Sequence, residues 1–92
     1  MDEPFDAAAA KAFIRSILAT GGVRFSTHAL EEMRKDSLVE RDIIHVLRAG
    51  LMKSPAEYEN GSWRYRIETV KVAVVIAFRS ETALVVVTAW RY

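Results

Sequence analysis

The fold of this chain is decided by the stretch Trp63-Arg64-Tyr65-Arg66-Ile67-Glu68, in which large apolar and charged side chains alternate. Successive side chains of a β-strand point to opposite faces of the sheet, so this strand has one apolar face and one charged face. Residues 71–79 and 84–90 are rich in β-branched and aromatic residues and predict two further strands. Their short connections permit only antiparallel hairpins.

A fourth, irregular strand is predicted over residues 51–58, at an edge of the sheet because Pro55 cannot donate a hydrogen bond inside a ladder. The pair Asn60-Gly61 supplies the hairpin turn that follows it. The last strand is apolar on both faces, so the pattern does not fix its register.

The first half of the chain has helical periodicity. Asp6 is a suitable N-cap for a first helix and Ser26 or Thr27 for a second, Ser37 begins a capping-box spacing for a third, and Gly50 suits the C′ position after it. Helices are predicted over residues 7–20, 26–36 and 38–49. The predicted fold class is α+β: two to three N-terminal helices packed on one face of a three- to four-stranded antiparallel sheet, as a single domain over residues 1–92.

Composition excludes several classes of function. The chain has 92 residues, a net charge of +1 and no cysteine, so it has neither disulfides nor a thiolate metal site. Two histidines and scattered carboxylates show no metal-ligand spacing, and we expect neither a metal nor another cofactor. The N-terminus is acidic and no apolar run is long enough to cross a bilayer, so we expect a cytoplasmic protein without a membrane partner.

Arg64 and Arg66 are the first candidates for a binding site, because both lie on the charged face of one strand. With Thr69-Val70 as a two-residue loop, Arg66 is expected opposite Ala73 and Arg64 opposite Val75. Two guanidinium groups side by side suit a bidentate phosphate ligand. The alternative is that they form salt bridges with nearby glutamates.

His28 is the candidate for proton transfer. It lies in the first turn of the second predicted helix, where the helix dipole disfavours a positive charge and so favours a neutral imidazole. The alternative is a partly buried histidine that is hydrogen-bonded to the backbone.

The residues around the second and third helices resemble a known family. Residues 22–30 read Gly-Val-Arg-Phe-Ser-x-His-Ala-Leu, and residues 42–50 read Asp-Ile-Ile-x-Val-Leu-x-x-Gly. These motifs resemble a widespread family of small bacterial domains that is similar to the RelE-fold toxins, especially to the MqsR type. The resemblance extends from about Ala12 to Tyr92 and implies a RelE-like fold.

This resemblance implies the toxin of a bacterial type II toxin–antitoxin system, which cleaves messenger RNA without a metal and is held inactive by a cognate antitoxin protein. Lys53, followed by Ser54, matches an active-site lysine of the MqsR type. Arg64 stands where that type has an active-site glutamine, and its active-site tyrosine has no counterpart here. His28 matches the histidine of the family's F-S-x-H-A motif.

In such a reaction the ribose 2′-hydroxyl attacks the adjacent phosphate, a base takes its proton, cations stabilise the added charge and an acid protonates the leaving oxygen. We expect His28 to be the base or acid. The expected phosphate ligands are Lys53, Arg64 and Arg66, and the expected further RNA contacts are Arg79, Arg91 and Tyr92. The alternatives are a non-catalytic protein-binding or regulatory module of the same fold, and a toxin that binds a protein target.

Overall fold

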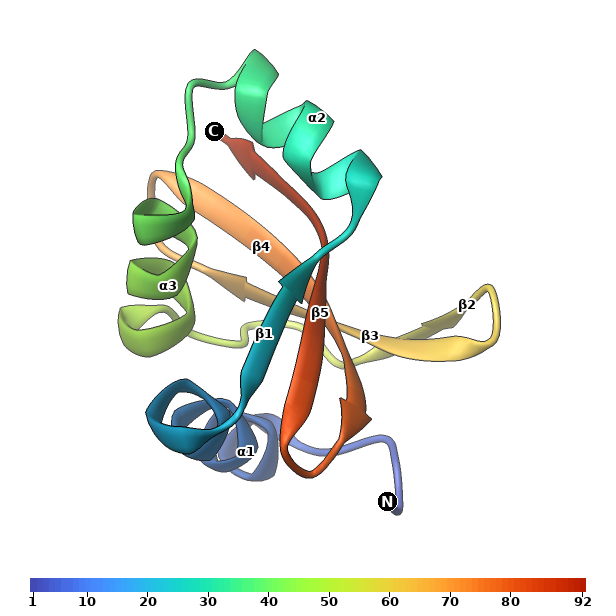
Figure 1. Cartoon of the computed structure of the whole chain (residues 1–92). Coiled ribbons are helices and arrows are strands. Elements are labelled where there is room, and N and C mark those ends of the chain that lie inside the picture. The colour runs from blue at the N-terminus through green and yellow to red at the C-terminus, as the bar shows by residue number, and fades with distance from the viewer.

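Three helices pack against a five-stranded sheet in the computed structural model, which describes residues 1–92 (Figure 1). The helices are α1 (Ala7–Thr20), α2 (Thr27–Lys35) and α3 (Glu40–Ala49). The strands are β1 (Gly22–Phe25), β2 (Glu57–Glu59), β3 (Ser62–Glu68), β4 (Val72–Ser80) and β5 (Ala83–Arg91), in the order β1-β5-β4-β3-β2. The predicted α+β architecture, with helices on a sheet, is confirmed.

The sheet is mixed because of one strand that the sequence did not reveal. β2, β3, β4 and β5 form antiparallel pairs, as expected, but β1 pairs in parallel with β5 at the other edge. The edge strand predicted over residues 51–58 is shorter: β2 covers only Glu57–Glu59, and Leu51 forms an isolated bridge with Glu68. The prediction of a purely antiparallel sheet is therefore wrong at this edge. Gly21 lies just before β1. A Cβ at this position would overlap the carbonyl oxygen of Thr82, so only a glycine fits there.

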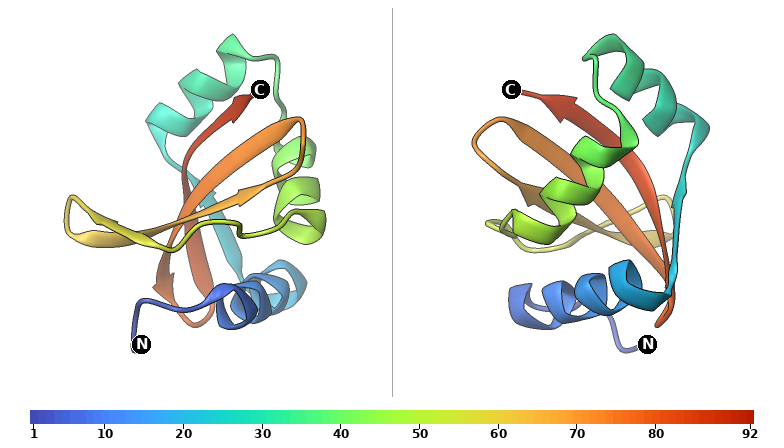
Figure 2. Two further views of the ribbon diagram at one scale, coloured as in Figure 1. Left: turned by 180° about the vertical axis from the view of Figure 1, so that it is seen from behind. Right: turned by 60° about the vertical axis from the view of Figure 1, so that its left-hand side comes forward.

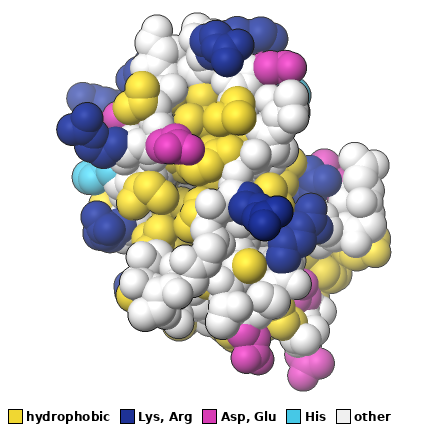
Figure 3. Space-filling view, viewed as in Figure 1, with side chains coloured by type: hydrophobic (Ala, Val, Ile, Leu, Met, Phe, Trp, Pro, Cys, Tyr) yellow, Lys and Arg dark blue, Asp and Glu magenta, His cyan; other side chains and the backbone are white.

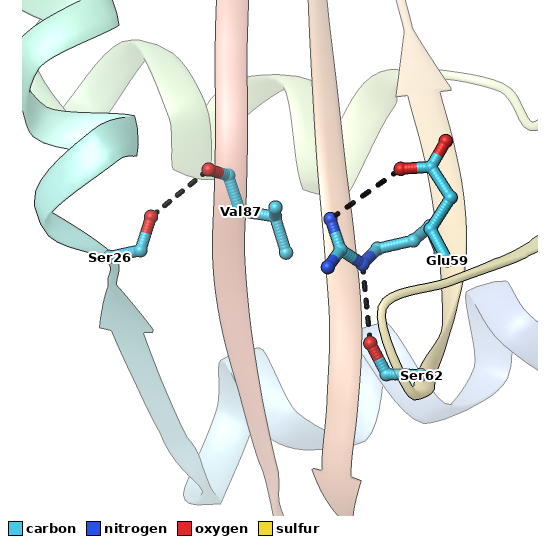
Figure 4. Close-up of polar contacts among 5 residues, drawn as sticks. Ser26, Glu59, Ser62 and Val87 are labelled. Carbon is cyan, nitrogen blue, oxygen red and sulfur yellow. Dashed lines mark hydrogen bonds and ion pairs between the residues drawn. The ribbon is translucent and has the colours of Figure 1, made fainter.

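Asp6 is the N-cap of α1, as predicted, and of the two candidates for α2 the N-cap is Ser26. The Asp6 carboxylate accepts a hydrogen bond from the Ala9 amide at 2.8 Å. Ser26 Oγ accepts from the Ala29 amide and donates to the carbonyl of Val87 on β5, both at 3.0 Å, and so fixes the start of α2 to the sheet (Figure 4).

The third helix begins later than predicted. Ser37 has a positive φ of 55°, and Val39 is the N-cap, its amide donating to the Asp42 carboxylate at 2.9 Å. Gly50 ends the helix in an extended conformation, not the left-handed C′ conformation that we predicted. A glycine is needed there because a Cβ would lie 2.6 Å from the Val46 carbonyl oxygen.

A buried lysine joins two helices. The Lys11 ammonium, on α1, donates to the carbonyls of Leu47 and Gly50 at 2.8 Å each and of Arg48 at 3.3 Å. These carbonyls at the C-terminal end of α3 have no partners within their own helix, so Lys11 satisfies them. Burial, and then the charge of Arg15, lower the pKa of Lys11.

The core lies between the helices and one face of the sheet. Tyr65, Ile67 and the inward residues of β4 are buried, whereas Trp63, on the same apolar face of β3, is only half-buried. Tyr65 Oη accepts from the Phe5 amide at 3.1 Å and donates to the Glu3 carboxylate at 2.8 Å. Burial is the main cause that raises the pKa of Tyr65 to about 12.

The other face of the sheet is open. Seen from behind, no helix crosses β3 and β4 (Figure 2, left). The β3–β4 turn is centred on Val70-Lys71, one residue later than expected, so Arg66 pairs with Val75 and not with Ala73. This shift of two residues in register keeps every side chain on its predicted face, and Arg64 and Arg66 remain on the open side.

No helix of the structure combines the length and the apolar character needed to span a membrane.

Candidate functional site on the open face of the sheet

The open face of the sheet carries a cleft of about 230 Å³. Residues from four strands and from the loop before β2 line it: Ser54, Pro55, Glu57, Glu59, Arg64, Arg66, Val75, Thr88 and Trp90. Its lining holds two arginines and two glutamates, so the cleft is strongly polar but balanced in formal charge.

Arg64 is the more enclosed of the two arginines, with 19% of its side chain exposed. Its Nε donates to Ser62 Oγ at 3.2 Å, and its Nη1 lies 4.0 Å from the Glu59 carboxylate (Figure 4). Glu57 stands directly opposite Arg64 in the β2–β3 ladder. The guanidinium is therefore held in place by neighbours on one hairpin.

Arg66 is freer, with 43% of its side chain exposed. Its Nε lies 3.2 Å from Glu68 Oε2, and its Nη2 donates to Ser54 Oγ at 3.2 Å. Both arginines thus make the ion pairs that were the alternative to phosphate binding. Each pair joins one side chain that is at least 43% exposed to one that is at most 19% exposed, so solvent reaches both pairs and a stronger anion can compete for the guanidinium groups.

Glu68 and Tyr92 form the shortest polar contact of this face. Tyr92 Oη donates to Glu68 Oε1 at 2.5 Å, across β4. Ala73 pairs with Glu68 on one side and with Trp90 on the other, so a small buried side chain lies beneath the contact. The Trp90 and Tyr92 rings meet edge to face, with centroids 6.4 Å apart.

This contact shifts the titration of both groups. The hydrogen bond from Tyr92, helped by the charges of Arg66 and Lys53, holds the pKa of Glu68 below its ordinary value although burial opposes this. The same hydrogen bond raises the pKa of Tyr92. At neutral pH, Glu68 is therefore a carboxylate and Tyr92 a phenol.

Lys53 lies at the margin of this site. Its exposed side chain is near enough to Glu68 to help lower the pKa of that carboxyl, although it does not line the cleft itself. An isolated bridge between Leu51 and Glu68 fixes the loop that carries Lys53 and Ser54 beside β3. Lys53 and the two arginines are thus brought together as expected.

Five predicted site residues do not line this cleft. Two of them, Lys53 and Tyr92, lie next to Glu68. His28 is exposed in the first turn of α2, and Arg79 is exposed near the end of β4. Arg91 lies on the opposite side of the sheet, where its Nε donates to the carbonyl of Asp36 at 3.1 Å. Arg91 and Tyr92, both expected to contact RNA, lie on different sides of the sheet, because neighbouring residues of one strand face opposite ways.

Sequence reasoning overlooked Arg24 and Thr88 as parts of this face, and it assigned no chemical role to Glu68. Arg24 lies on it because Val23 and Phe25, its neighbours on β1, pack against the core. The alternation of β3 already placed Glu68 beside Arg66, but only as a salt-bridge partner. Thr88 faces the cleft because a β-bulge at Val87 reverses the alternation of β5.

The model of the family described as "Domain of unknown function (DUF4258)" matches residues 25–91. The chain belongs to this family. The DUF4258 match contains α2, α3 and β2 to β5, and with them all residues that line the cleft; α1 and Tyr92 lie outside it. No curated protein and no solved structure shows significant similarity to the chain.

Proposed function

We propose that the open face of the sheet binds single-stranded RNA and cleaves it without a metal ion, as the toxin of a bacterial type II toxin–antitoxin system. The observation that carries this proposal is the shared placement of two arginines, one lysine and the Glu68–Tyr92 pair on one uncovered surface. The resemblance of the helical motifs to RelE-fold toxins of the MqsR type gives the proposal its biological setting. In that setting the protein acts in the cytoplasm and a cognate antitoxin protein controls it.

Phosphate binding is assigned to Arg66 and Arg64, with Lys53 at the margin. A phosphate group between the two arginines would receive charge-assisted hydrogen bonds from groups that the hairpin already orients. Arg66 gives up little to make these bonds, because its present ion pair with Glu68 is partly exposed to solvent.

Base stacking is assigned to Trp90 and Tyr92. Their rings stand edge to face next to the cleft, and Tyr92 is exposed on its outer side. Stacking of a nucleobase on an aromatic side chain typically contributes about 1–3 kcal/mol and tolerates any base.

Proton transfer is assigned to Glu68 and Tyr92. The 2′-hydroxyl oxygen attacks phosphorus while the Glu68 carboxylate takes its proton; the bond from phosphorus to the 5′-oxygen breaks and Tyr92 protonates that oxygen. The products are a 2′,3′-cyclic phosphate and a free 5′-hydroxyl. Glu68 suits the first role because it is ionised at neutral pH, and Tyr92 suits the second because its raised pKa keeps it protonated. His28 has no role in this scheme, because it is exposed in the first turn of α2 and makes no hydrogen bond or ion pair with Glu68, Tyr92 or a residue of the cleft.

A non-catalytic binding module is the second candidate function. One observation favours it: both arginines already pair with glutamates, and the cleft lining carries equal numbers of basic and acidic side chains. Such a cleft suits a polar peptide that exchanges ion pairs with it.

Cleavage of a labelled single-stranded RNA, with and without ribosomes and in the presence of EDTA, tests the proposal. We expect products with 2′,3′-cyclic phosphate ends, and a loss of rate of about 100- to 10,000-fold in Glu68→Gln. His28→Gln is the matched control and should cleave at the wild-type rate. Cleavage lost in His28→Gln but retained in Glu68→Gln would return the proton-transfer role to the histidine. A wild-type protein that cleaves no RNA under any of these conditions would favour the binding module.

A further inference from the structure

A second concave surface, remote from the open-face cleft, runs along α3. One hollow of about 650 Å³ lies between α3 and the β3–β4 turn, and a second of about 530 Å³ lies between the ends of α2 and α3. The two hollows share Leu38 and Arg41 and are together called the α3 groove. None of its residues lines the open-face cleft.

The lining of the α3 groove includes large aliphatic side chains that are exposed to solvent. Val70 is 84% exposed, Val39 is 55% exposed and Leu30 is 42% exposed, and the half-buried Ile44 lies among them. Figure 3 shows apolar side chains gathered between α2 and α3. A single exposed valine or leucine is ordinary, but several in one groove indicate an interaction surface. Leu30, three residues before the buried Met33 on α2, is exposed here and is part of this surface.

The rim of the groove is cationic, and its charges are unpaired. Its basic side chains are Arg34, Arg41, His45, Arg48, Lys71 and Arg91. None of these side chains forms an ion pair, since the three ion pairs of the molecule are Lys35–Glu32, Arg64–Glu59 and Arg66–Glu68. The groove contains only two acidic residues. One of them, Asp42, already accepts a hydrogen bond from the Val39 amide.

Part of this rim is fixed in place. Arg91 Nε and Nη2 donate to the carbonyls of Asp36 and Ser37 at 3.1 and 3.3 Å, and the Asp36 carboxylate accepts from the Arg91 amide at 2.7 Å. The end of β5 thereby holds the α2–α3 connection. This part of the groove is therefore held in place before any ligand binds, which lowers the cost of binding.

We propose that the α3 groove binds an acidic amphipathic segment of a protein partner. Aliphatic side chains of that segment lie on Val39, Ile44 and Val70, and its Asp and Glu residues lie against the unpaired cations of the rim. The exposed aliphatic side chains favour a protein over a nucleic acid, because the groove has no Phe, Tyr or Trp on which a base could stack. The unpaired positive charges of the rim favour an acidic partner. This inference does not depend on RNA cleavage by the open face.

The test is an NMR titration of the full chain with a synthetic helical peptide that carries leucines at i, i+3, i+4 and i+7 and glutamates on the flanks. We expect shifts confined to the α3 groove, and binding at least about tenfold weaker for the same peptide with lysine in place of glutamate. Arg41→Gln/Arg48→Gln and Val70→Ser should each weaken binding of the acidic peptide. The matched double variant Arg15→Gln/Lys35→Gln, which changes two exposed cations outside the groove, should not.

Several results would overturn the inference. One is the absence of binding by the acidic peptide, and another is binding that the groove variants leave unchanged. Binding of a single-stranded RNA that the groove variants abolish would make this a nucleic-acid surface, and concentration-dependent dimerisation lost in Val70→Ser would make it an interface between copies. RNA cleavage is measured in Arg41→Gln/Arg48→Gln as well. If this variant loses peptide binding but still cleaves RNA, the groove and the open face act independently, and a failure of one proposal is not a failure of the other.

Discussion

Removing the hydroxyl of Tyr92 tests the polar contact on which the proposed chemistry depends. In Tyr92→Phe, Glu68 Oε1 loses its 2.5 Å hydrogen bond, while Oε2 keeps Arg66 at 3.2 Å. A hydrogen bond to a charged group contributes about 1.5–3 kcal/mol, and the partial exposure of Tyr92 places this one near the lower end. We therefore expect the free energy of unfolding to fall by about 1.5 kcal/mol at pH 7.

A double-mutant cycle separates this contact from other effects of the substitution. The unfolding free energies of wild type, Tyr92→Phe, Glu68→Gln and the double variant, measured in urea, give the coupling between the two side chains. Tyr58→Phe is the matched control, because Tyr58 and Tyr92 are both 61% exposed and no hydrogen bond joins the Tyr58 hydroxyl to another residue. Its effect should stay below about 0.5 kcal/mol.

The coupling should depend on pH at both ends of the range. Glu68 has a lowered pKa in the folded state, so its contribution is complete above its ordinary value of 4.5 and is lost as the pH falls through the folded value. Tyr92 has a raised pKa, so its contribution is complete below its ordinary value of 10.0 and is lost as the pH rises through the folded value. Single-variant effects that add to within about 0.3 kcal/mol at pH 7 would refute the contact.

Two further predictions concern the frame that supports the site. Lys11→Met should lower the unfolding free energy by about 2 kcal/mol, because three carbonyls at the end of α3 lose their donor. The control Lys35→Met, at an exposed position, should change the unfolding free energy by less than about 0.5 kcal/mol. Equal effects of the two substitutions would contradict the capping role of Lys11. Gly50→Ala should cost about 2 kcal/mol in thermal or urea unfolding, because its Cβ would meet two backbone carbonyl oxygens at 2.6 and 2.9 Å. A Cβ at Gly22 meets nothing within 4 Å, so Gly22→Ala should be nearly neutral, and a neutral Gly50→Ala would contradict the close approach.

The sequence predicted the hairpin half of the sheet well, because three long strands with strong local signals follow one another. Asn60-Gly61 has the positive φ angles of 47° and 82° that its hairpin turn requires, and the two arginines are on the face that alternation assigned to them. β1 was missed for the opposite reason. It has only four residues, and its partner β5 is about sixty residues away, so no local pattern announces the pairing.

The candidate site was only partly predictable because it depends on an irregularity of β5. An uninterrupted alternation from Leu84 and Val86 would point Thr88 and Trp90 into the core. The bulge at Val87 turns them, and Tyr92 with them, to the open face. The strand is apolar on both faces, so no polar residue marks where the alternation reverses. Arg91 lies between Trp90 and Tyr92 and therefore points to the other side of the sheet, where it lines the α3 groove.

The salt dependence of RNA binding tests the central claim, that Arg64 and Arg66 bind the phosphates of RNA, most directly. Affinity for a single-stranded RNA oligonucleotide is measured across a range of salt concentrations for wild type, Arg64→Gln/Arg66→Gln and the charge-matched control Arg15→Gln/Lys35→Gln, all confirmed as folded. Each phosphate contact contributes about −0.7 to the slope of log K against log salt, so loss of two contacts should flatten the slope by about 1.4. The control should keep the wild-type slope and affinity. Equal slopes and affinities in all three proteins would contradict the claim and leave both arginines as salt-bridge partners of the sheet.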